Sequence, residues 1–403
     1  MKNAARTPAA QYLKLIRQSL AGIRRDVPRL AKLGEAMARP ILAGGNLVPS
    51  RIAPFWPSEF TGRAGGLMGL RWFDYVPRTR NDVAYFALPD PRRWDPRKDD
   101  LLQKLIKSPG ELFVVGRPED LKALGSTRRF AGFTGGTAAD AGLYGTEAVR
   151  PLAPLRQFEQ FVRGWATAGE LIAACTRAGR MPLVWMSVWL EGALVRNAHF
   201  MPHNNRREPW PAPMFHRDVY IPPLAPGHVA GEFLDFVEGM LGALERQLGA
   251  LARAGEWMAA ACRAKKRVFA VATGHSYPEI LERPKEGYPI EWGASISDLT
   301  KAMPADLGRG DVSVHFGYAP VMVEDVQKIL ARGIRFIYTS PYGRPAALKD
   351  HKNLVWLDLP WRPADACIDV PGYSVRILPS SSSAHTMAYF AMVAEMANNM
   401  QWC

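Results

Sequence analysis

The stretch QYLKLIRQSLAGIRRDVPRLAKLGEAMA, residues 11–38, is repeated later in the chain as EFLDFVEGMLGALERQLGALARAGEWMA, residues 232–259. The two stretches align without a gap at an offset of 221 residues. Apolar residues recur in both at helical spacing, which predicts amphipathic helices, although such helices also resemble one another by chance. Nine positions are identical: Leu13/Leu234, Leu20/Leu241, Arg25/Arg246, Leu30/Leu251, Ala31/Ala252, Gly34/Gly255, Glu35/Glu256, Met37/Met258 and Ala38/Ala259.

The segments that follow each repeat are also parallel, which favours a duplication over chance. ILAGGN (41–46) follows the first repeat as an apolar run, and VFAVATGHS (268–276) follows the second. NDVAYFALPD (81–90) then parallels GDVSVHFGYA (310–319), and GELFVVGRPED (110–120) parallels GIRFIYTSPYG (333–343). Apolar strands that alternate with helices indicate a parallel sheet covered on both faces. We therefore predict an α/β protein of two tandem three-layer α/β/α sandwiches, flavodoxin-like or Rossmann-like, with parallel sheets.

Three regions follow from this pattern. Residues 1–195 form a first domain, 196–231 an irregular connector rich in Pro and Asn, and 232–403 a second domain. Two aromatic–histidine pairs in the connector, His199-Phe200 and Phe215-His216, either pack or line a cleft.

Composition limits the class of protein. The chain has 403 residues, 48% of them hydrophobic and 22% charged, which is ordinary for a globular protein of two or three domains. No stretch approaches the roughly 20 apolar residues that span a bilayer, and the N-terminus lacks the apolar region of a secretory signal. Four scattered cysteines predict free thiols, a cytoplasmic protein and no metal site. We expect no membrane partner and no cofactor.

The net charge of +13 raises the question of nucleic acid. The basic residues, however, come as scattered pairs rather than as one face with interleaved aromatic residues, which favours anionic small molecules over nucleic acid. These pairs are Arg24-Arg25, Arg92-Arg93, Arg128-Arg129, Arg206-Arg207 and Lys265-Lys266-Arg267.

Two polar segments lie where a parallel sheet binds ligands, at the carboxyl ends of strands and the amino ends of helices. TGHS (273–276) follows a predicted strand, and PSSSSAHT (379–386) precedes the predicted helix MAYFAMVAEMA (387–397). Glycine and serine here suit a phosphate. The serine run is equally suited to cap a helix.

The second half resembles the sugar isomerase (SIS) domain family, whose members bind phosphosugars. The resemblance covers FAVATGHSYPEI, DVSVHFGYAPVMVEDVQKILARGIRFIYTS and PSSSSAHTMAYFAMVAEMA, and its Gly-His-Ser order is closest to a bacterial branch of the family. It implies that substrate is bound by Gly274, His275, Ser276 and the serine quartet Ser380, Ser381, Ser382 and Ser383. The family's second loop departs here: HFGYAP (315–320) keeps Gly317, but Phe316, Tyr318 and Ala319 replace hydroxyl side chains.

The first half resembles phosphoheptose isomerases over GNLVPSRIAPFWPSEFTGR (45–63). The match EFTGR implies that Glu59 takes the place of the catalytic base, which moves a proton between adjacent carbons. The family's glycines and serine have become Leu47, Val48 and Pro49, and Ser50 is displaced by one position. The segment PLRQFEQFVRGW (154–165) also lacks the family's catalytic histidine, so this half looks decayed or repurposed.

Aldose–ketose isomerisation needs a base and a group that shuttles a hydroxyl proton. The candidates are Glu59, Glu279, Glu291, His275 and His385. Glu291 is placed roughly where Glu59 stands in the first half, Glu279 is equally suited to a helix dipole, and His385 could face a ligand or cap a carbonyl. His315 either packs in the core or contacts a ligand.

Two functions follow: a sugar phosphate isomerase without metal or nucleotide, and a non-catalytic sugar-phosphate sensor or structural protein. Both bind a sugar phosphate or a sugar derivative, and both are compatible with a homo-oligomer.

Overall fold

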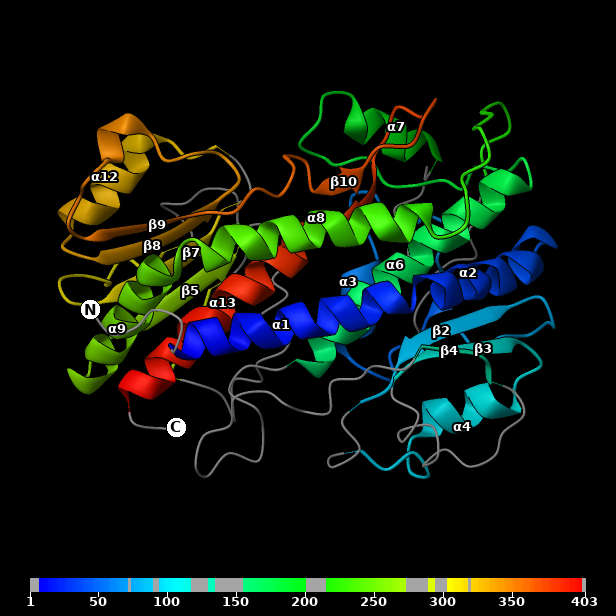
Figure 1. Ribbon diagram of the computed structural model, residues 1–403, viewed down its shortest axis with the longest axis horizontal. Coiled ribbons are helices and arrows are strands. Elements are labelled where there is room, and N and C mark those ends of the chain that lie inside the picture. The colour runs from blue at the N-terminus through cyan, green and yellow to red at the C-terminus, as the bar shows by residue number, and fades with distance from the viewer. Residues whose placement is uncertain are drawn as a thin grey trace.

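The computed structural model describes residues 7–71, 74–89, 94–116, 130–134, 155–200, 215–272, 289–293, 303–317 and 320–400. The chain forms two parallel sheets with helices on their faces (Figure 1), so the predicted α/β class is confirmed. The first sheet has the order β1 (Leu47–Pro49), β2 (Val83–Ala87), β3 (Glu111–Val115) and β4 (Phe130–Thr134). The second has the order β6 (Glu291–Trp292), β5 (Val268–Ala272), β7 (Val312–Phe316), β8 (Arg335–Ser340) and β9 (Leu354–Asp358).

Helices flank both sheets, and each half begins with two long consecutive helices. In the first half they are α1 (Pro8–Arg25), α2 (Val27–Leu42), α3 (Phe55–Phe60), α4 (Asp100–Lys107), α6 (Arg156–Arg177) and α7 (Ala193–Phe200). In the second half they are α8 (His228–Glu245), α9 (Leu248–Arg263), α12 (Val323–Ala331), the short η2 (Ala346–Leu348) and α13 (Ser381–Asn399). An antiparallel pair, β10 (Ala366–Ile368) and β11 (Ile377–Pro379), precedes α13. The predicted domain limits at 195 and 232 therefore fall inside α7 and α8.

The first strand does not lie where the sequence predicted it. ILAGGN was expected to be a strand, but α2 continues to Leu42 with Pro40 inside its last turns, and β1 begins at Leu47. The backbone turns between them at Gly44, whose φ of +91° favours glycine. Since Leu47 and Val268 are again 221 residues apart, the sequence offset of the helices extends into the first strand of each sheet.

One aspartate fixes the start of the second strand in each half. The backbone N–H of Asn46, just before β1, donates to Asp82 at 3.0 Å, and that of Arg267, just before β5, donates to Asp311 at 3.0 Å. Asp82 also accepts hydrogen bonds from the backbone N–H groups of Arg78 and Thr79. Burial alone would raise the pKa of Asp82, but the hydrogen bonds outweigh burial, so the pKa is lowered. The repeated Asp-Val pair of the sequence is thus explained by strand placement.

The first helix of each half packs against helices of the other half. Helix α1 packs on α13 and α8, and α8 packs on α6 and α1; the two long helices lie side by side between the sheets (Figure 1). The backbone N–H of Ala9 in α1 donates to Glu395 of α13 at 2.8 Å, and that of Ala230 in α8 donates to Glu170 of α6 at 2.9 Å. Each carboxylate therefore satisfies a free amide at the amino end of the exchanged helix.

The repeated glycines allow two close helix contacts. A Cβ atom on Gly34 would lie 2.5 Å from the backbone of Glu170, and one on Gly255 would lie 2.3 Å from Cβ of Glu395. Both distances are far below van der Waals contact, so α2 can approach α6, and α9 can approach α13, only where a side chain is missing.

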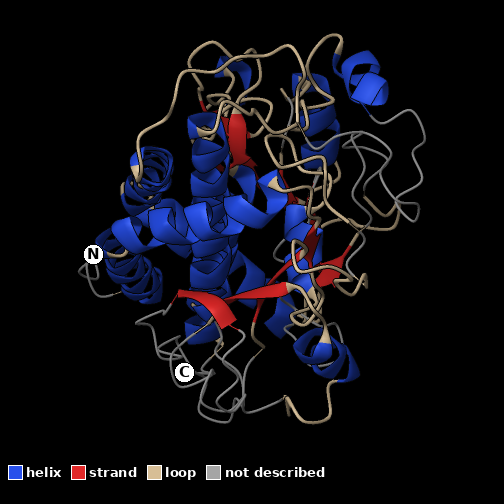
Figure 2. Ribbon diagram, turned by 90° about the vertical axis from the view of Figure 1, so that its right-hand side faces the viewer, coloured by secondary structure: helices blue, strands red, loops and turns tan. Residues whose placement is uncertain are grey.

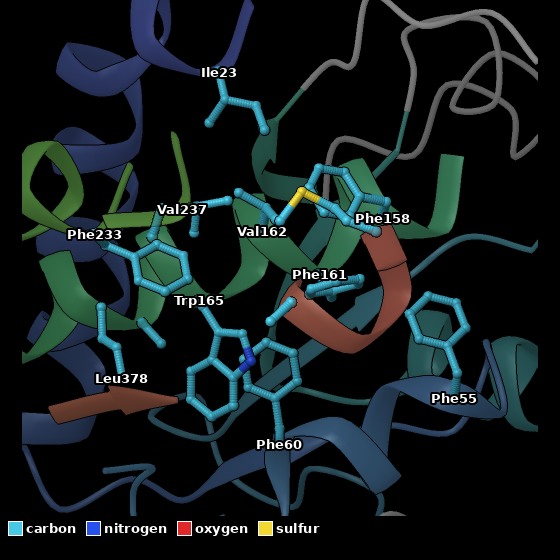
Figure 3. Packing of buried hydrophobic residues seen from close by; sticks show 14 of the residues in the cluster. Ile23, Phe55, Phe60, Phe158, Phe161, Val162, Trp165, Phe233, Val237 and Leu378 are labelled. Atoms are coloured by element: carbon cyan, nitrogen blue, oxygen red, sulfur yellow. The ribbon is translucent and has the colours of Figure 1, made fainter. Parts of the chain in front are cut away.

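One hydrophobic core runs through both halves. Its side chains come from all the long helices and from the inner faces of both sheets. Figure 3 shows Ile23 of α1, Trp165 of α6 and Phe233 of α8 in this shared core. Helix α13 is buried along 381–397 and packs on α9, α1 and α8. Figure 2 shows helices of the protein crossing one another near its centre. A second, smaller cluster lies under α12 on the outer face of the second sheet.

Candidate functional site

The amino end of α13 meets the first half in a buried network of charged and polar side chains. Glu59, in α3, is 1% exposed and points across the junction toward the serine quartet. Its carboxylate accepts hydrogen bonds from Trp165 Nε1 at 2.7 Å, Arg63 Nη1 at 3.0 Å and Ser382 Oγ at 2.8 Å. Burial raises the pKa of Glu59, and Arg63, Trp165 and Ser382 offset this only in part.

Arg63 is the centre of this network. Its guanidinium is fully buried and donates to Glu59, to Asp365 at 2.7 Å, to Ser381 Oγ at 3.1 Å and to Ser382 Oγ. The first half thereby reaches into the serine quartet of the second half.

Asp365 occupies the amino end of α13. Its carboxylate accepts the backbone N–H of Ser380 at 2.9 Å and of Ser381 at 2.7 Å, and its backbone carbonyl accepts Ser380 Oγ at 2.8 Å. Burial alone would raise the pKa of Asp365, but Arg63 and the two amides outweigh it, so the pKa is lowered. The Asp365 carboxylate therefore occupies the position at which the sequence predicted a bound phosphate.

The backbone around Asp365 is strained. Ala364, Asp365 and Leu378 have φ values of 70°, 73° and 61°, a left-handed conformation that costs non-glycine residues free energy. The first half approaches this segment closely, because Leu378 donates its backbone N–H to the carbonyl of Gly65 at 3.0 Å. Gly65 itself has a φ of +76°, and a Cβ atom there would lie 2.7 Å from the amide of Leu378.

The serine quartet is largely tied up in bonds inside the protein, and its side chains do not cap α13. All four serines are buried, and Ser380, Ser381 and Ser382 are bonded to Asp365, Arg63 and Glu59. The cap itself is made by the Asp365 carboxylate, because the Ser380 side chain makes no capping bond. Ser383 Oγ is buried without a partner.

His385 lies between this network and the carboxyl ends of β7 and β9. Its ring is fully buried, 5.2 Å from the ring of Phe316 and 4.8 Å from that of Trp361. Burial lowers the pKa of His385 to about 3; Asp365 opposes this shift and Arg63 adds to it. The imidazole is therefore neutral, and neither ring nitrogen has a hydrogen-bond partner.

Other buried polar atoms near this end of the second sheet also lack partners. Thr339 Oγ1 comes from the end of β8, on the same strand face as core residue Ile337, and Trp361 Nε1 follows β9. Thr386 Oγ1 is the third, in the second turn of α13. Each such group costs about 1–3 kcal/mol when left unsatisfied, so native proteins keep few of them without a reason.

Glu291 does not occupy a place like that of Glu59. It pairs with Phe269 near the amino end of β5, is about half exposed, and forms an ion pair with Arg267 at 2.6 Å. At the offset of 221 its counterpart is Leu70, which forms a parallel bridge to Leu47 of β1. The predicted equivalence of Glu291 with Glu59 is therefore wrong, and Glu291 supports the edge of the second sheet.

Gly317 and His315 are explained by packing. The Tyr338 hydroxyl lies 2.1 Å from where a Cβ atom of Gly317 would be, and the Gly317 N–H donates to the carbonyl of Thr339 at 3.0 Å. His315 stacks on Tyr338 at 5.2 Å, on the α12 face of the sheet and away from α13. The predicted site residues Gly274, His275 and Ser276, together with Glu279, lie outside the described residues.

In the first half, aromatic rings fill the carboxyl end of the sheet. Phe60 stacks on Trp165 with 4.2 Å between ring centroids (Figure 3), and Trp56 packs on Phe60 at 4.5 Å and on Tyr85 at 5.0 Å. Trp56 Nε1 donates to the carbonyl of Tyr85 at 2.9 Å. A small pocket beside these rings is lined mainly by aliphatic and aromatic side chains, among them Leu67 and Leu171.

The sequence missed three members of the network: Arg63, Trp165 and Asp365. Arg63 was visible as the last residue of EFTGR, four residues beyond Glu59, but Trp165 and Asp365 carry no local signal. The aromatic–histidine pairs of the connector pack together, with Phe200 and His216 rings 5.1 Å apart.

Neither a metal site nor a membrane span is found in the described part of the chain. No three His, Cys, Asp or Glu side chains among those residues converge as metal ligands would. None of the helices described combines the length and the apolar character needed to cross a bilayer.

No protein-family model and no curated protein matches the sequence. Solved structures are similar to it at low identity. The C-terminal domain of glucosamine-fructose-6-phosphate aminotransferase from Francisella tularensis is 11% identical with a TM-score of 0.47, covering 100% of this chain and 97% of that one. A candidate phosphosugar isomerase from Silicibacter pomeroyi DSS-3 is 12% identical with a TM-score of 0.46, covering 97% and 96%. A candidate tagatose-6-phosphate ketose/aldose isomerase from Clostridium novyi NT is 7% identical with a TM-score of 0.43, covering 97% and 90%.

Proposed function

We propose that this chain is a non-catalytic binding protein for a sugar derivative, phosphorylated sugars included, with its site at the carboxyl end of the second sheet. The observation that carries the proposal is His385, a fully buried imidazole whose two nitrogens have no partner. It lies against Phe316 at the end of β7 and Trp361 beyond β9, at the carboxyl ends of the strands, where open parallel sheets bind ligands.

The chemistry around His385 suits a neutral, hydroxyl-rich ligand. A neutral imidazole offers one donor and one acceptor, the hydroxyls of Thr339 and Ser383 offer both, and Trp361 Nε1 offers a donor. The rings of Phe316 and Trp361 on either side of His385 add apolar surface for C–H faces. A few polar groups among aromatic residues are typical of small-molecule sites.

The phosphate of such a ligand needs a different partner from the serine quartet. Asp365 already holds the amino end of α13, and a second anion beside it would be repelled. The Gly274–His275–Ser276 segment, which directly follows β5 in the sequence, therefore remains the candidate for the phosphate group.

The hydrogen bonds of the Glu59 carboxylate argue against isomerisation and so favour a binding protein. A general base must reach a proton of the substrate, but both carboxylate oxygens of Glu59 are bonded to Trp165, Arg63 and Ser382 inside the protein. The raised pKa of Glu59 is the one observation that favours an isomerase, because a base is most effective with a pKa near the working pH.

Thermal unfolding with hexoses, hexosamines and their 6-phosphates tests the binding proposal. At about 100 times its Kd a ligand stabilises the native state by about 2.7 kcal/mol, which raises the Tm by a few degrees. We expect this shift in the wild type and its loss in His385→Phe, which keeps the ring but removes both nitrogens. Tyr12→Phe, which alters a buried polar group near the start of α1, is the matched control and should keep the shift. A panel without any shift, or an equal shift in His385→Phe, contradicts the proposal.

Exchange of the C2 hydrogen of a bound sugar for deuterium separates binding from isomerisation. We expect ligands that bind to show no exchange above buffer. Exchange that is present in the wild type and lost in Glu59→Gln would establish the isomerase instead.

A further inference from the structure

The turn between Trp361 and the hairpin of β10 and β11 is strained. Its closing bond runs from the N–H of Asp365 to the carbonyl of Arg362 at 3.0 Å. Pro363 has the second position of the turn and Ala364, with a φ of 70°, has the third, where a type II turn favours glycine. Asp365 follows with a φ of 73°. Two consecutive non-glycine residues thus adopt the left-handed conformation, and such strain persists only where surrounding contacts enforce it.

Contacts from several elements hold Asp365 in this conformation. Its carboxylate accepts the N–H groups of Ser380 and Ser381, and its backbone carbonyl accepts Ser380 Oγ at 2.8 Å. Arg63, from the first half, donates to the same carboxylate at 2.7 Å. Strand β10 begins at the next residue, Ala366. The strained turn is therefore fixed by the amino end of α13, by the first half and by the hairpin.

The same turn connects two groups of the candidate site. Trp361 directly precedes the turn, and its ring lies 4.8 Å from that of His385. His385 follows Ser381 by four residues in α13, so it lies about one helical turn from the N–H that Asp365 holds. Trp361 Nε1 and both nitrogens of His385 are buried without a partner. The conformation of the turn thus sets the spacing between two unsatisfied groups that one ligand would contact together.

We propose that Ala364 and Asp365 are positioning residues, whose strained turn holds Trp361 and His385 at the spacing that a sugar ligand requires. The inference rests on the proposed binding function and adds the residues that keep its site in shape. A site that already has its binding geometry loses little conformational freedom when the ligand binds. Strained residues are typical of ligand clamps, and relief of such strain raises stability while it weakens function.

Ala364→Gly tests this proposal, because a purely structural turn gives no reason for stability and affinity to change in opposite directions. Glycine adopts a positive φ without strain, so the Tm should rise. The turn also gains freedom, so the affinity for glucose, glucosamine or their 6-phosphates, measured by calorimetric titration, should fall about tenfold. Lys265→Gly is the matched control: Lys265 is exposed, follows α9 and has a φ of 54°. It should raise the Tm and leave the affinity unchanged.

The NMR signals of the His385 ring protons report the same spacing without any ligand. They are assigned by their loss in His385→Phe. We expect them to shift in Ala364→Gly and to stay in place in Lys265→Gly, because the ring current of Trp361 acts on nearby protons with a steep dependence on distance. A shift in Ala364→Gly in a protein that binds none of the sugars upholds the positioning and contradicts the proposed function.

Asp365→Asn and Asp365→Ala test the second positioning residue. Asparagine keeps an oxygen for the N–H groups of Ser380 and Ser381 and tolerates a positive φ, whereas alanine does neither. We expect the His385 signals and the sugar affinity to change less in Asp365→Asn than in Asp365→Ala. If Asp365→Ala does not fold, Ala364→Gly decides the question. A lower Tm in Ala364→Gly, unshifted His385 signals, or sugar affinity equal to that of the wild type overturns the proposal.

Discussion

The carboxyl ends of the two sheets are built from corresponding positions with different side chains. At the offset of 225 that relates Glu170 to Glu395, the serine quartet corresponds to Leu155–Phe158, and His385 corresponds to Gln160. Gln160 donates to the carbonyl of Leu88, just beyond β2, at 2.7 Å, whereas both nitrogens of His385 lack a partner. Aromatic rings fill much of this end in the first half, where Ser50 Oγ and Gln160 Oε1 are also buried without a partner. The second half differs in placing an imidazole with two unpartnered nitrogens, together with Thr339 and Trp361, at the corresponding end.

Replacing Arg63 gives the largest effect expected, because this residue of the first half holds the polar end of the second. Arg63→Met leaves Glu59 and Asp365 buried without their cation, and breaking a buried pair typically costs about 3–5 kcal/mol. Urea unfolding of the variant measures this loss. Arg63→Met combined with Asp365→Asn should regain part of it, since the uncompensated charge is removed. A loss below about 1 kcal/mol would mean that the two halves do not depend on this network.

The two repeated glycines should behave alike if the helix contacts of the two halves are equivalent. Gly34→Ala and Gly255→Ala each place a Cβ atom against backbone of the partner helix, and overpacking of this kind costs about 1–3 kcal/mol. Gly239→Ala in α8, where a Cβ atom meets nothing within 4 Å, is the control. It should stabilise the protein by roughly 0.5–1 kcal/mol through helix propensity. Unequal costs at Gly34 and Gly255 would show that the two contacts differ.

The repeat and the strands were readable from the sequence, because apolar periodicity is local. NDVAYFALPD, GELFVVGRPED and their counterparts are strands as predicted, but ILAGGN was too short for its period to distinguish a helix end from a strand. The candidate site was less readable. Glu59 and the serine quartet do meet, yet the residues that decide what they do, Arg63 and Asp365, lie 302 positions apart. A serine run that binds phosphate and one tied to an internal carboxylate look the same in sequence.

Acid should destabilise the protein through two buried histidines of the second half, His385 and His315. Burial lowers the pKa of His385 and of His315 to about 3, whereas an unfolded histidine titrates near 6.5. Between these values the unfolded state binds more protons, so the free energy of unfolding falls as the pH falls through 6.5 and levels off near 3. From pH 7 to 5 each histidine costs up to about 2 kcal/mol.

Urea unfolding of His385→Phe at pH 7 and at pH 5 isolates the contribution of His385 to the pH dependence of the free energy of unfolding. The difference between the two pH values should shrink by up to about 2 kcal/mol relative to the wild type, with His315 and His216 supplying the slope that remains. An unchanged difference would mean that His385 is not buried and neutral.

The smallest effect expected is a gain in stability, and it follows from comparing α1 with α8. Tyr12 of α1 corresponds to Phe233 of α8 at the offset of 221, and both side chains are fully buried. The Tyr12 hydroxyl has no partner and burial raises its pKa, so the first half carries a polar atom that the second half has replaced by a plain ring. Removing such a group relieves its desolvation cost, so Tyr12→Phe should stabilise the protein by up to about 1 kcal/mol in urea unfolding. Phe233→Tyr introduces the same orphan hydroxyl into α8 and should cost about 1–3 kcal/mol. If Tyr12→Phe destabilises instead, the hydroxyl has a partner, and the two helix environments are less alike than their sequences.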